Sequence, residues 1–206
     1  MKQTNNRELT LSEQFNGFIN RITTTKGKDY YSLLSTSDFI ELKSVLSNIN
    51  NIITLRVTHS FADCLLYSGV VNLRQHADIK TDIDSTSANT NGFDVNFTGK
   101  VGRADGIVAE VKCNIPVKAD RFGAAQLANL EKDVEGLQHG KTKAKGVNTE
   151  NHLKFLVLLD DGERVHKAAV RFAETMRLRG IQIEVVDNLK PTNLQANTIY
   201  VIILKV

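Results

Sequence analysis

The chain has 206 residues, of which 41% are apolar and 24% charged, and its formal net charge is +3. This composition is ordinary for a globular protein with a substantial core, and the small positive excess permits a nucleic-acid partner without requiring one. The two cysteines supply neither a disulfide framework nor a zinc-ligand set, and no apolar run approaches the length of about 18 residues that indicates a membrane span. The N-terminus carries no apolar signal segment, so we expect a cytoplasmic protein.

The first seventy residues predict a mainly helical part. One apolar stripe has spacings of three and four residues, typical of a helix face, and consists of Leu11, Phe15, Phe18 and Ile22. A second helix is expected from Ser37 or Asp38 onward, and a third across residues 55–65. The helical part is expected to cover residues 1–75 of a single domain that spans residues 1–206.

Residues 78–91 are rich in Ser, Thr, Asn and Asp, a composition that predicts a surface loop. A β-hairpin is expected next. Residues 93–97 alternate apolar and polar side chains, glycines follow, and the strand-like segment GIVAEVKCNI continues the pattern.

The rest of the chain alternates predicted helices and strands. A helix is expected over residues 120–138, and the almost wholly apolar segment LKFLVLLD predicts a central strand covered on both faces. A further helix over 163–179 and two strands, at 181–187 and 199–206, complete the pattern. The expected fold class is α/β (or α+β), with a mixed central sheet, helices on both faces and an α/β core over residues 92–206.

Two charged residues stand on one face of the second hairpin strand. Glu110 and Lys112 are two residues apart, so their side chains point the same way. If the hairpin register is centred on Gly102, Asp94 lies opposite Glu110, with Cβ atoms about 5 Å apart. Two carboxylates at that separation can share one Mg²⁺ ion, and Lys112 can reach an attacking water or a phosphate oxygen. Asp105 is closer in sequence, but its odd spacing from Glu110 points it to the opposite face.

The constellation Asp94, Glu110-Val111-Lys112 and the helix and strand that follow it resembles the PD-(D/E)xK nuclease superfamily, over roughly residues 92–160. The resemblance implies a restriction-endonuclease-like fold. It also implies that Asp94, Glu110 and the backbone carbonyl of Val111 bind Mg²⁺, while Lys112 positions or activates the water. Phe93 stands where the motif name has Pro.

Two further residues are candidates for this site. Gln126 interrupts the apolar stripe of its predicted helix, and it either bonds to a neighbouring backbone group or faces the hairpin. Family members often carry a polar residue, frequently Gln, on this helix, which implies a catalytic role for Gln126. The family also often carries a Glu on its first helix near the metals, for which Glu13 is the first candidate.

Lysines crowd the loop after this helix, at Lys141, Lys143 and Lys145. A basic loop at the edge of an active site can follow a DNA backbone, so we expect these side chains to contact phosphates, although a solvated surface is the ordinary alternative.

The expected function is a Mg²⁺-dependent DNA endonuclease that hydrolyses phosphodiester bonds, most naturally a type II-like restriction enzyme that acts as a homodimer. One alternative is a structure-specific nuclease of the Holliday-junction type. Another is a catalytically inactive nuclease-like module that binds nucleic acid or protein, in which Glu110 and Lys112 form a simple ion pair.

Overall fold

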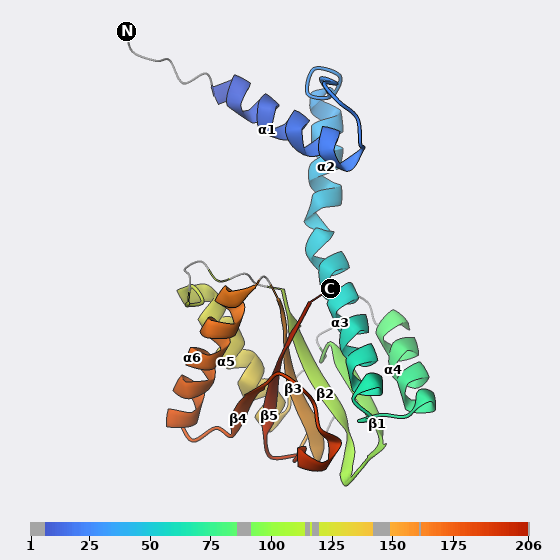
Figure 1. Ribbon diagram of the computed structural model, residues 1–206, viewed down its shortest axis with the longest axis vertical. Helices are drawn as coiled ribbons and strands as arrows, with labels where there is room; N and C mark the ends of the chain where they lie inside the picture. The colour runs from blue at the N-terminus through green and yellow to red at the C-terminus, as the bar shows by residue number, and fades with distance from the viewer. Residues whose placement is uncertain are drawn as a thin grey trace. The chain divides into compact units, whose positions relative to one another are not determined.

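The computed structural model divides the chain into two compact units, Met1–Ile49 and Asn50–Val206 (Figure 1). It describes residues 7–85, 92–113, 116, 120–141, 149–160 and 162–205. The helical part expected up to residue 75 is therefore shared between the units, because its later helices belong to the unit that carries the sheet.

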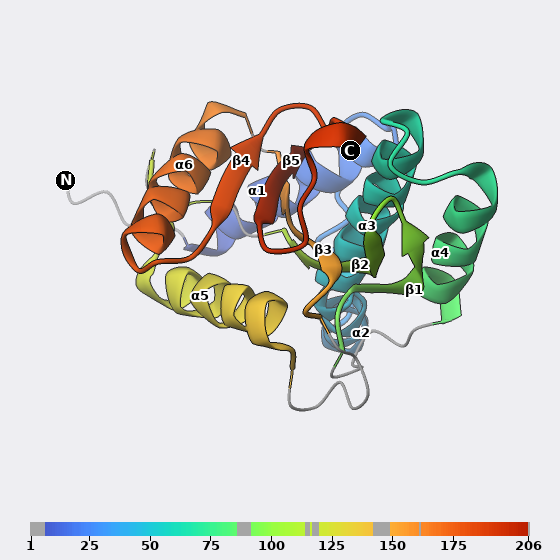
Figure 2. The same cartoon turned by 90° about the horizontal axis from the view of Figure 1, so that it is seen from below.

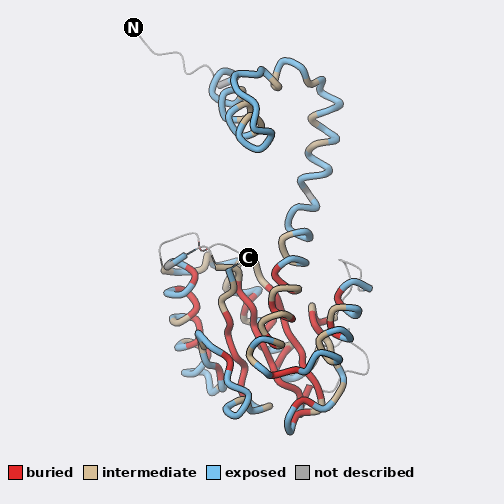
Figure 3. The backbone as a smooth tube through the Cα atoms, turned by 45° about the vertical axis from the view of Figure 1, so that its right-hand side comes forward, coloured by how far each residue is buried: buried red, intermediate tan, exposed pale blue. Residues whose placement is uncertain are grey.

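The first unit contains α1 (Arg7–Ile22) and α2 (Thr36–Ser47), two of the expected helices. Ser35 caps α2, since its hydroxyl accepts from the Asp38 N–H at 3.2 Å and the Asp38 carboxylate accepts from the Ser35 N–H at 2.7 Å. The rings of Phe15 and Phe39 meet at a centroid distance of 5.3 Å. Among residues 7–49 whose burial is described, none is buried (Figure 3), so the core of the protein lies in the second unit.

The second unit is built on a five-stranded mixed sheet in the order β1-β2-β3-β5-β4. Only the edge strand β1 is antiparallel to its neighbour, and the other pairs are parallel. The strands are β1 (Val95–Val101), β2 (Ala104–Lys112), β3 (His152–Leu159), β4 (Ile183–Val186) and β5 (Ile199–Leu204). The expected mixed α/β class is confirmed, with β3 central and almost wholly buried as its apolar sequence predicted.

Helices cover both faces of this sheet (Figures 1 and 2). On one face, α3 (Ile49–Tyr67) and α4 (Leu73–Ser85) enclose a core in which Phe61 meets Phe155 at a centroid distance of 5.2 Å. On the other face, α5 (Ala124–His139) and α6 (Glu163–Leu178) cover the second core. The alternation of β2 therefore sends Ile107 and Ala109 to the first core and Val108 to the second.

The prediction of a loop over residues 78–91 is wrong for residues 78–85, which form the end of α4, while residues 86–91 lie outside the described part of the chain. Ile79 and Ile83 stand four residues apart and are both buried in the core beside β1. The helix also has a reciprocal cap, because Asn72 and Gln75 each accept the other's backbone N–H, at 3.0 and 2.9 Å. Two buried isoleucines and one helix cap are thus enough to make residues 78–85 helical despite their polar composition.

A bulge sets the register of the β1–β2 hairpin. The turn is tight, with Val101 paired to Ala104 and Gly102 at φ 59°, which a two-residue hairpin turn requires. Between this pair and the pair Thr98–Gly106, β1 carries one extra residue. Beyond the bulge the register is the one that the sequence predicted, centred on Gly102. Without the bulge every side chain of β1 would face the opposite side of the sheet.

Candidate active site

Asp94 and Glu110 lie beside each other where β1 begins and β2 approaches its carboxyl end. The pairing of Val95 with Ala109 makes Asp94 the residue opposite Glu110. The Asp94 Oδ2 atom accepts the backbone N–H of Val111 at 2.7 Å, so Asp94 is held against β2 by a backbone hydrogen bond. The N–H and C=O groups of one strand residue point to the same edge, so the carbonyl of Val111 is directed to the edge of β2 that Asp94 contacts.

Glu110 is a buried carboxyl group, 2% exposed, on the face of β2 that α5 covers. Burial, reinforced by the negative charge of Asp94, raises the pKa of Glu110 from 4.5 to about 7, although Lys141 and Lys112 act in the opposite direction. A carboxyl group with this pKa exchanges its proton near neutral pH, which is a property typical of functional sites.

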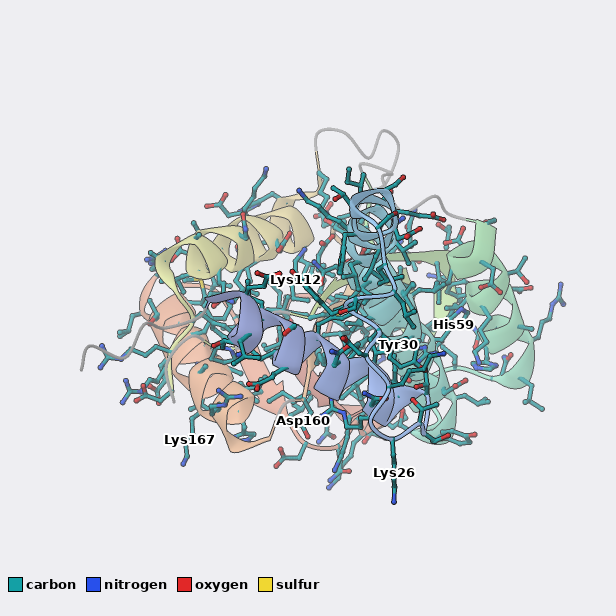
Figure 4. The ribbon with its side chains drawn as sticks, turned by 90° about the horizontal axis from the view of Figure 1, so that it is seen from above. Lys26, Tyr30, His59, Lys112, Asp160 and Lys167 are labelled. Carbon is teal, nitrogen blue, oxygen red and sulfur yellow. The ribbon has the colours of Figure 1, made fainter. Side chains whose placement is uncertain are left out.

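Lys112 lies between two carboxylates at the last position of β2. Its Nζ atom is 3.5 Å from Glu110 Oε2 and 3.1 Å from Asp133 Oδ2. Lys112 is labelled among the side chains in Figure 4. Burial opposes the charged form of Lys112, but Asp133, Glu110 and Asp94 together raise its pKa above the usual value. Lys112 is therefore a permanent ammonium group within reach of the buried carboxylate.

Asp133 is a member of the cluster that the sequence analysis missed. It lies on α5, is 8% exposed and stands between the buried residues Leu130 and Leu137. The same signal that drew attention to Gln126, a polar residue within an apolar helical stripe, is stronger at this position. A carboxylate three residues after one buried leucine and four before the next predicts a buried charge with a partner.

Lys141 lies two residues after the end of α5, and its ammonium group points into the same cluster. It forms an ion pair with Glu110 Oε1, donates to the carbonyl of Gly92 at 2.9 Å and lies 5.1 Å from the centroid of the Phe93 ring. The sequence analysis expected Lys141 to contact phosphates from a surface loop. Lys143 and Lys145, expected to share that role, lie outside the described residues.

Gln126 lies near the start of α5, where its Oε1 atom accepts the backbone N–H of Gly123 at 2.9 Å. This is the backbone bond that was one of its two expected roles, and it caps the helix. Glu13 is an exposed residue of α1 and belongs to the N-terminal unit, so it is not among the residues that the sheet unit brings together.

Asp105 lies within β2. It forms an ion pair with Lys100 and accepts from Asn151 Nδ2 at 2.8 Å. Glu110 is five positions further along the strand, a distance of roughly 16 Å at about 3.3 Å per residue. As expected, Asp105 is no partner for Glu110.

The donor set suits a hard divalent cation. Among the residues that the structure describes, no group of three or more His, Cys, Asp or Glu side chains is placed to hold a metal ion. The protein donors would therefore be the carboxylates of Asp94 and Glu110 and the Val111 carbonyl. Mg²⁺ is usually bound by one or two carboxylates, with waters and substrate phosphates completing its shell, so these residues fit the ion.

Comparisons with protein-family models, with curated proteins and with solved structures gave no match. In the described part of the chain, no helix has the length and apolar character needed to cross a membrane. The chemistry of the cluster itself is therefore the basis on which a function can be assigned.

Proposed function

We propose that this protein is a Mg²⁺-dependent DNA endonuclease of the restriction-endonuclease-like type, which hydrolyses phosphodiester bonds. The observation that carries the proposal is Glu110, a buried carboxyl group with a pKa near 7, flanked by Asp94 on one side and by the ammonium group of Lys112 on the other. A structural ion pair at a sheet edge needs no second carboxylate beside it, whereas a shared cation does.

Each residue has a distinct role in the proposed reaction. Asp94, Glu110 and the Val111 carbonyl would hold Mg²⁺, which would supply positive charge to polarise the phosphodiester and activate water as the nucleophile. Hydrolysis adds the water oxygen to phosphorus and breaks one ester P–O bond. Lys112 orients the water and offsets the negative charge that develops on the phosphoryl oxygens, and Asp133 holds the ammonium group in position.

A second candidate, a nuclease-like module that binds without cleaving, is favoured by one observation. The Glu110 carboxylate already has two lysine partners, Lys112 and Lys141, which balance its charge without a metal. A closed ion-pair cluster of this kind can be purely structural. The two candidates differ in what a divalent cation does to DNA in the presence of the protein.

The test incubates supercoiled plasmid and synthetic four-way junctions with the protein in Mg²⁺, Ca²⁺ or EDTA. Cleavage in Mg²⁺ that stops in EDTA supports the proposal. Discrete linear fragments support a restriction enzyme that cuts both strands as a homodimer. Selective cleavage of junctions supports the structure-specific class instead, and intact DNA under every condition supports the binding module.

Matched carboxylate variants test the assignment of the metal ligands. Asp94→Asn and Glu110→Gln should each eliminate cleavage, by at least about a thousandfold, because each removes a charged metal ligand. Asp105→Asn is the control: its carboxylate is on the same hairpin but bonds to Lys100 and Asn151. Substantial cleavage by Asp94→Asn, with loss in Asp105→Asn, would overturn the hairpin site.

A further inference from the structure

The side chain of Lys141 packs against the protein along its stem and at its ammonium group. Its stem runs against Gly136 of α5, where an added Cβ atom would lie 3.1 Å from the Lys141 Cγ and 3.3 Å from its Cε. Glycine at this helical position therefore leaves the room that the stem occupies. Only 24% of the side chain is exposed.

The ammonium group of Lys141 meets three partners that together form a cation site. Glu110 supplies a carboxylate oxygen, Gly92 a backbone carbonyl at 2.9 Å and Phe93 the face of its ring. A carboxylate and a carbonyl are also ligands that a hard divalent cation prefers. A lysine used only to follow a DNA backbone would gain nothing from such an enclosed position.

A divalent cation and the Lys141 ammonium group would repel each other if both stood in contact with Glu110 Oε1. We propose that Lys141 is a resident counter-ion of Glu110 which a divalent cation must displace, a proposal that rests on the metal-dependent function above. In the metal-free protein Lys141 offsets part of the negative charge of the site, and metal binding releases its ammonium group at the edge of the site. The released group becomes available to a DNA phosphate.

The charges of the cluster support this exchange. Asp94, Glu110 and Asp133 carry three formal negative charges, and Lys112 and Lys141 carry two positive ones. With all five groups ionised the sum is −1 before a divalent cation binds. It is +1 afterwards if the released Lys141 ammonium group at the edge of the site is counted, and a phosphodiester group complements that charge. Metal and DNA should therefore each increase the affinity of the other, because reciprocal coupling follows from a shared equilibrium.

The test measures Mn²⁺ and Mg²⁺ binding without DNA by calorimetry. Lys141→Met keeps the apolar stem and removes the competing charge, so it should bind the metal about tenfold or more tightly than the wild type. Lys154→Met is the matched control, because Lys154 is a buried lysine of β3 whose Nζ atom contacts backbone carbonyls. Its metal affinity should equal that of the wild type.

Gly136→Ala provides a second variant that changes no charge. The added methyl group crowds the Lys141 stem, and Ala is a better helix former than Gly by about 1 kcal/mol, so α5 stays folded. This variant should tighten metal binding in the same direction as Lys141→Met but by less. It should also weaken the dependence of DNA affinity on metal, as should Lys141→Met.

Wild-type plasmid cleavage in Mg²⁺, measured in parallel, separates the two proposals. If the wild type cleaves and Lys141→Met binds metal no more tightly, the counter-ion role of Lys141 is wrong while the nuclease remains. If the wild type neither binds metal nor cleaves DNA, both proposals fail. Tighter metal binding by Lys141→Met and Gly136→Ala, with Lys154→Met unchanged, supports the exchange.

Discussion

Lys154 and Lys112 are lysines of the sheet unit that lie, partly or fully buried, at opposite ends of adjacent parallel strands, and their surroundings differ in kind. Lys154, near the amino end of β3, donates to the carbonyls of His152 at 3.2 Å and Glu150 at 3.4 Å and to that of Ala196. Lys112, at the carboxyl end of β2, faces the carboxylates of Glu110 and Asp133.

The pKa values record this difference. Burial lowers the pKa of Lys154, since the neutral carbonyls around it do not compensate for lost hydration. Burial acts on Lys112 as well, but the nearby carboxylates raise its pKa above the usual value. A buried lysine can therefore either bond to backbone carbonyls of neighbouring segments or place a positive charge in a site. The groups that surround the lysine, rather than its burial, distinguish these two roles.

The largest expected difference between these lysines is in catalysis. Lys112→Met should reduce cleavage by about 10² to 10⁴-fold, because its charge acts on the transition state. Lys154→Met should cleave within about twofold of the wild type under conditions where both variants are folded. The measurement is the initial rate of plasmid cleavage at saturating Mg²⁺, and equal losses in both variants would contradict the assignment.

Glu110, beside Lys112, also predicts that the free energy of unfolding depends on pH. Glu110 has a pKa of about 7 in the folded protein and about 4.5 when unfolded, so the folded state holds more protons between these values. Glu110 therefore makes folding less favourable as pH rises from 4.5 to 7, by on the order of 3 kcal/mol.

Urea unfolding of the wild type and Glu110→Gln at several pH values measures this contribution. The free energy of unfolding of the wild type, relative to that of the variant, should fall across the window from pH 4.5 to 7 and stay level above it. The difference cancels the other titrating groups. A constant difference between the two proteins over this window would show that the pKa of Glu110 is not raised.

The smallest expected effect concerns the structural lysine. Lys154→Met leaves the buried carbonyl groups without their donor, which should lower the free energy of unfolding by about 1–3 kcal/mol at neutral pH. Urea denaturation measures the change. An unchanged or increased stability would mean that the cost of burying the Lys154 charge exceeds the gain from its hydrogen bonds.

Local sequence patterns predicted most of the helices and strands. They failed at the end of α4, where a pair of buried isoleucines and a distant helix cap were the only helical signals. The strands and the central position of β3 followed from apolar runs, because such runs are stable only when covered on both faces. The end of α4 was missed because only Ile79 and Ile83 mark its buried side within a polar segment. The Asn72–Gln75 cap, which could have indicated the helix, lies before that segment.

In the candidate site, too, residues close together along the chain could be predicted, whereas residues that meet only through packing could not. Glu110, Lys112 and Asp94 could be singled out because alternation along a hairpin relates them over a short stretch of chain. Lys141 comes to Glu110 from beyond α5, so no periodicity connects the two. Asp133 left a helical signal, but its partner Lys112 could be identified only once α5 was seen to pack on β2.

A mixed α/β unit, and a shared face for Glu110 and Lys112, follow from the amino-acid order alone, because strand alternation and apolar periodicity are local properties. The other members of the site depend on how the strands and helices pack. The bulge on β1 placed Asp94 opposite Glu110, since a shift of one residue reverses the faces of a strand. The packing of α5 brought Asp133 to Lys112, and the chain after it brought Lys141 to Glu110, because attraction between charges depends on distance in space rather than along the chain.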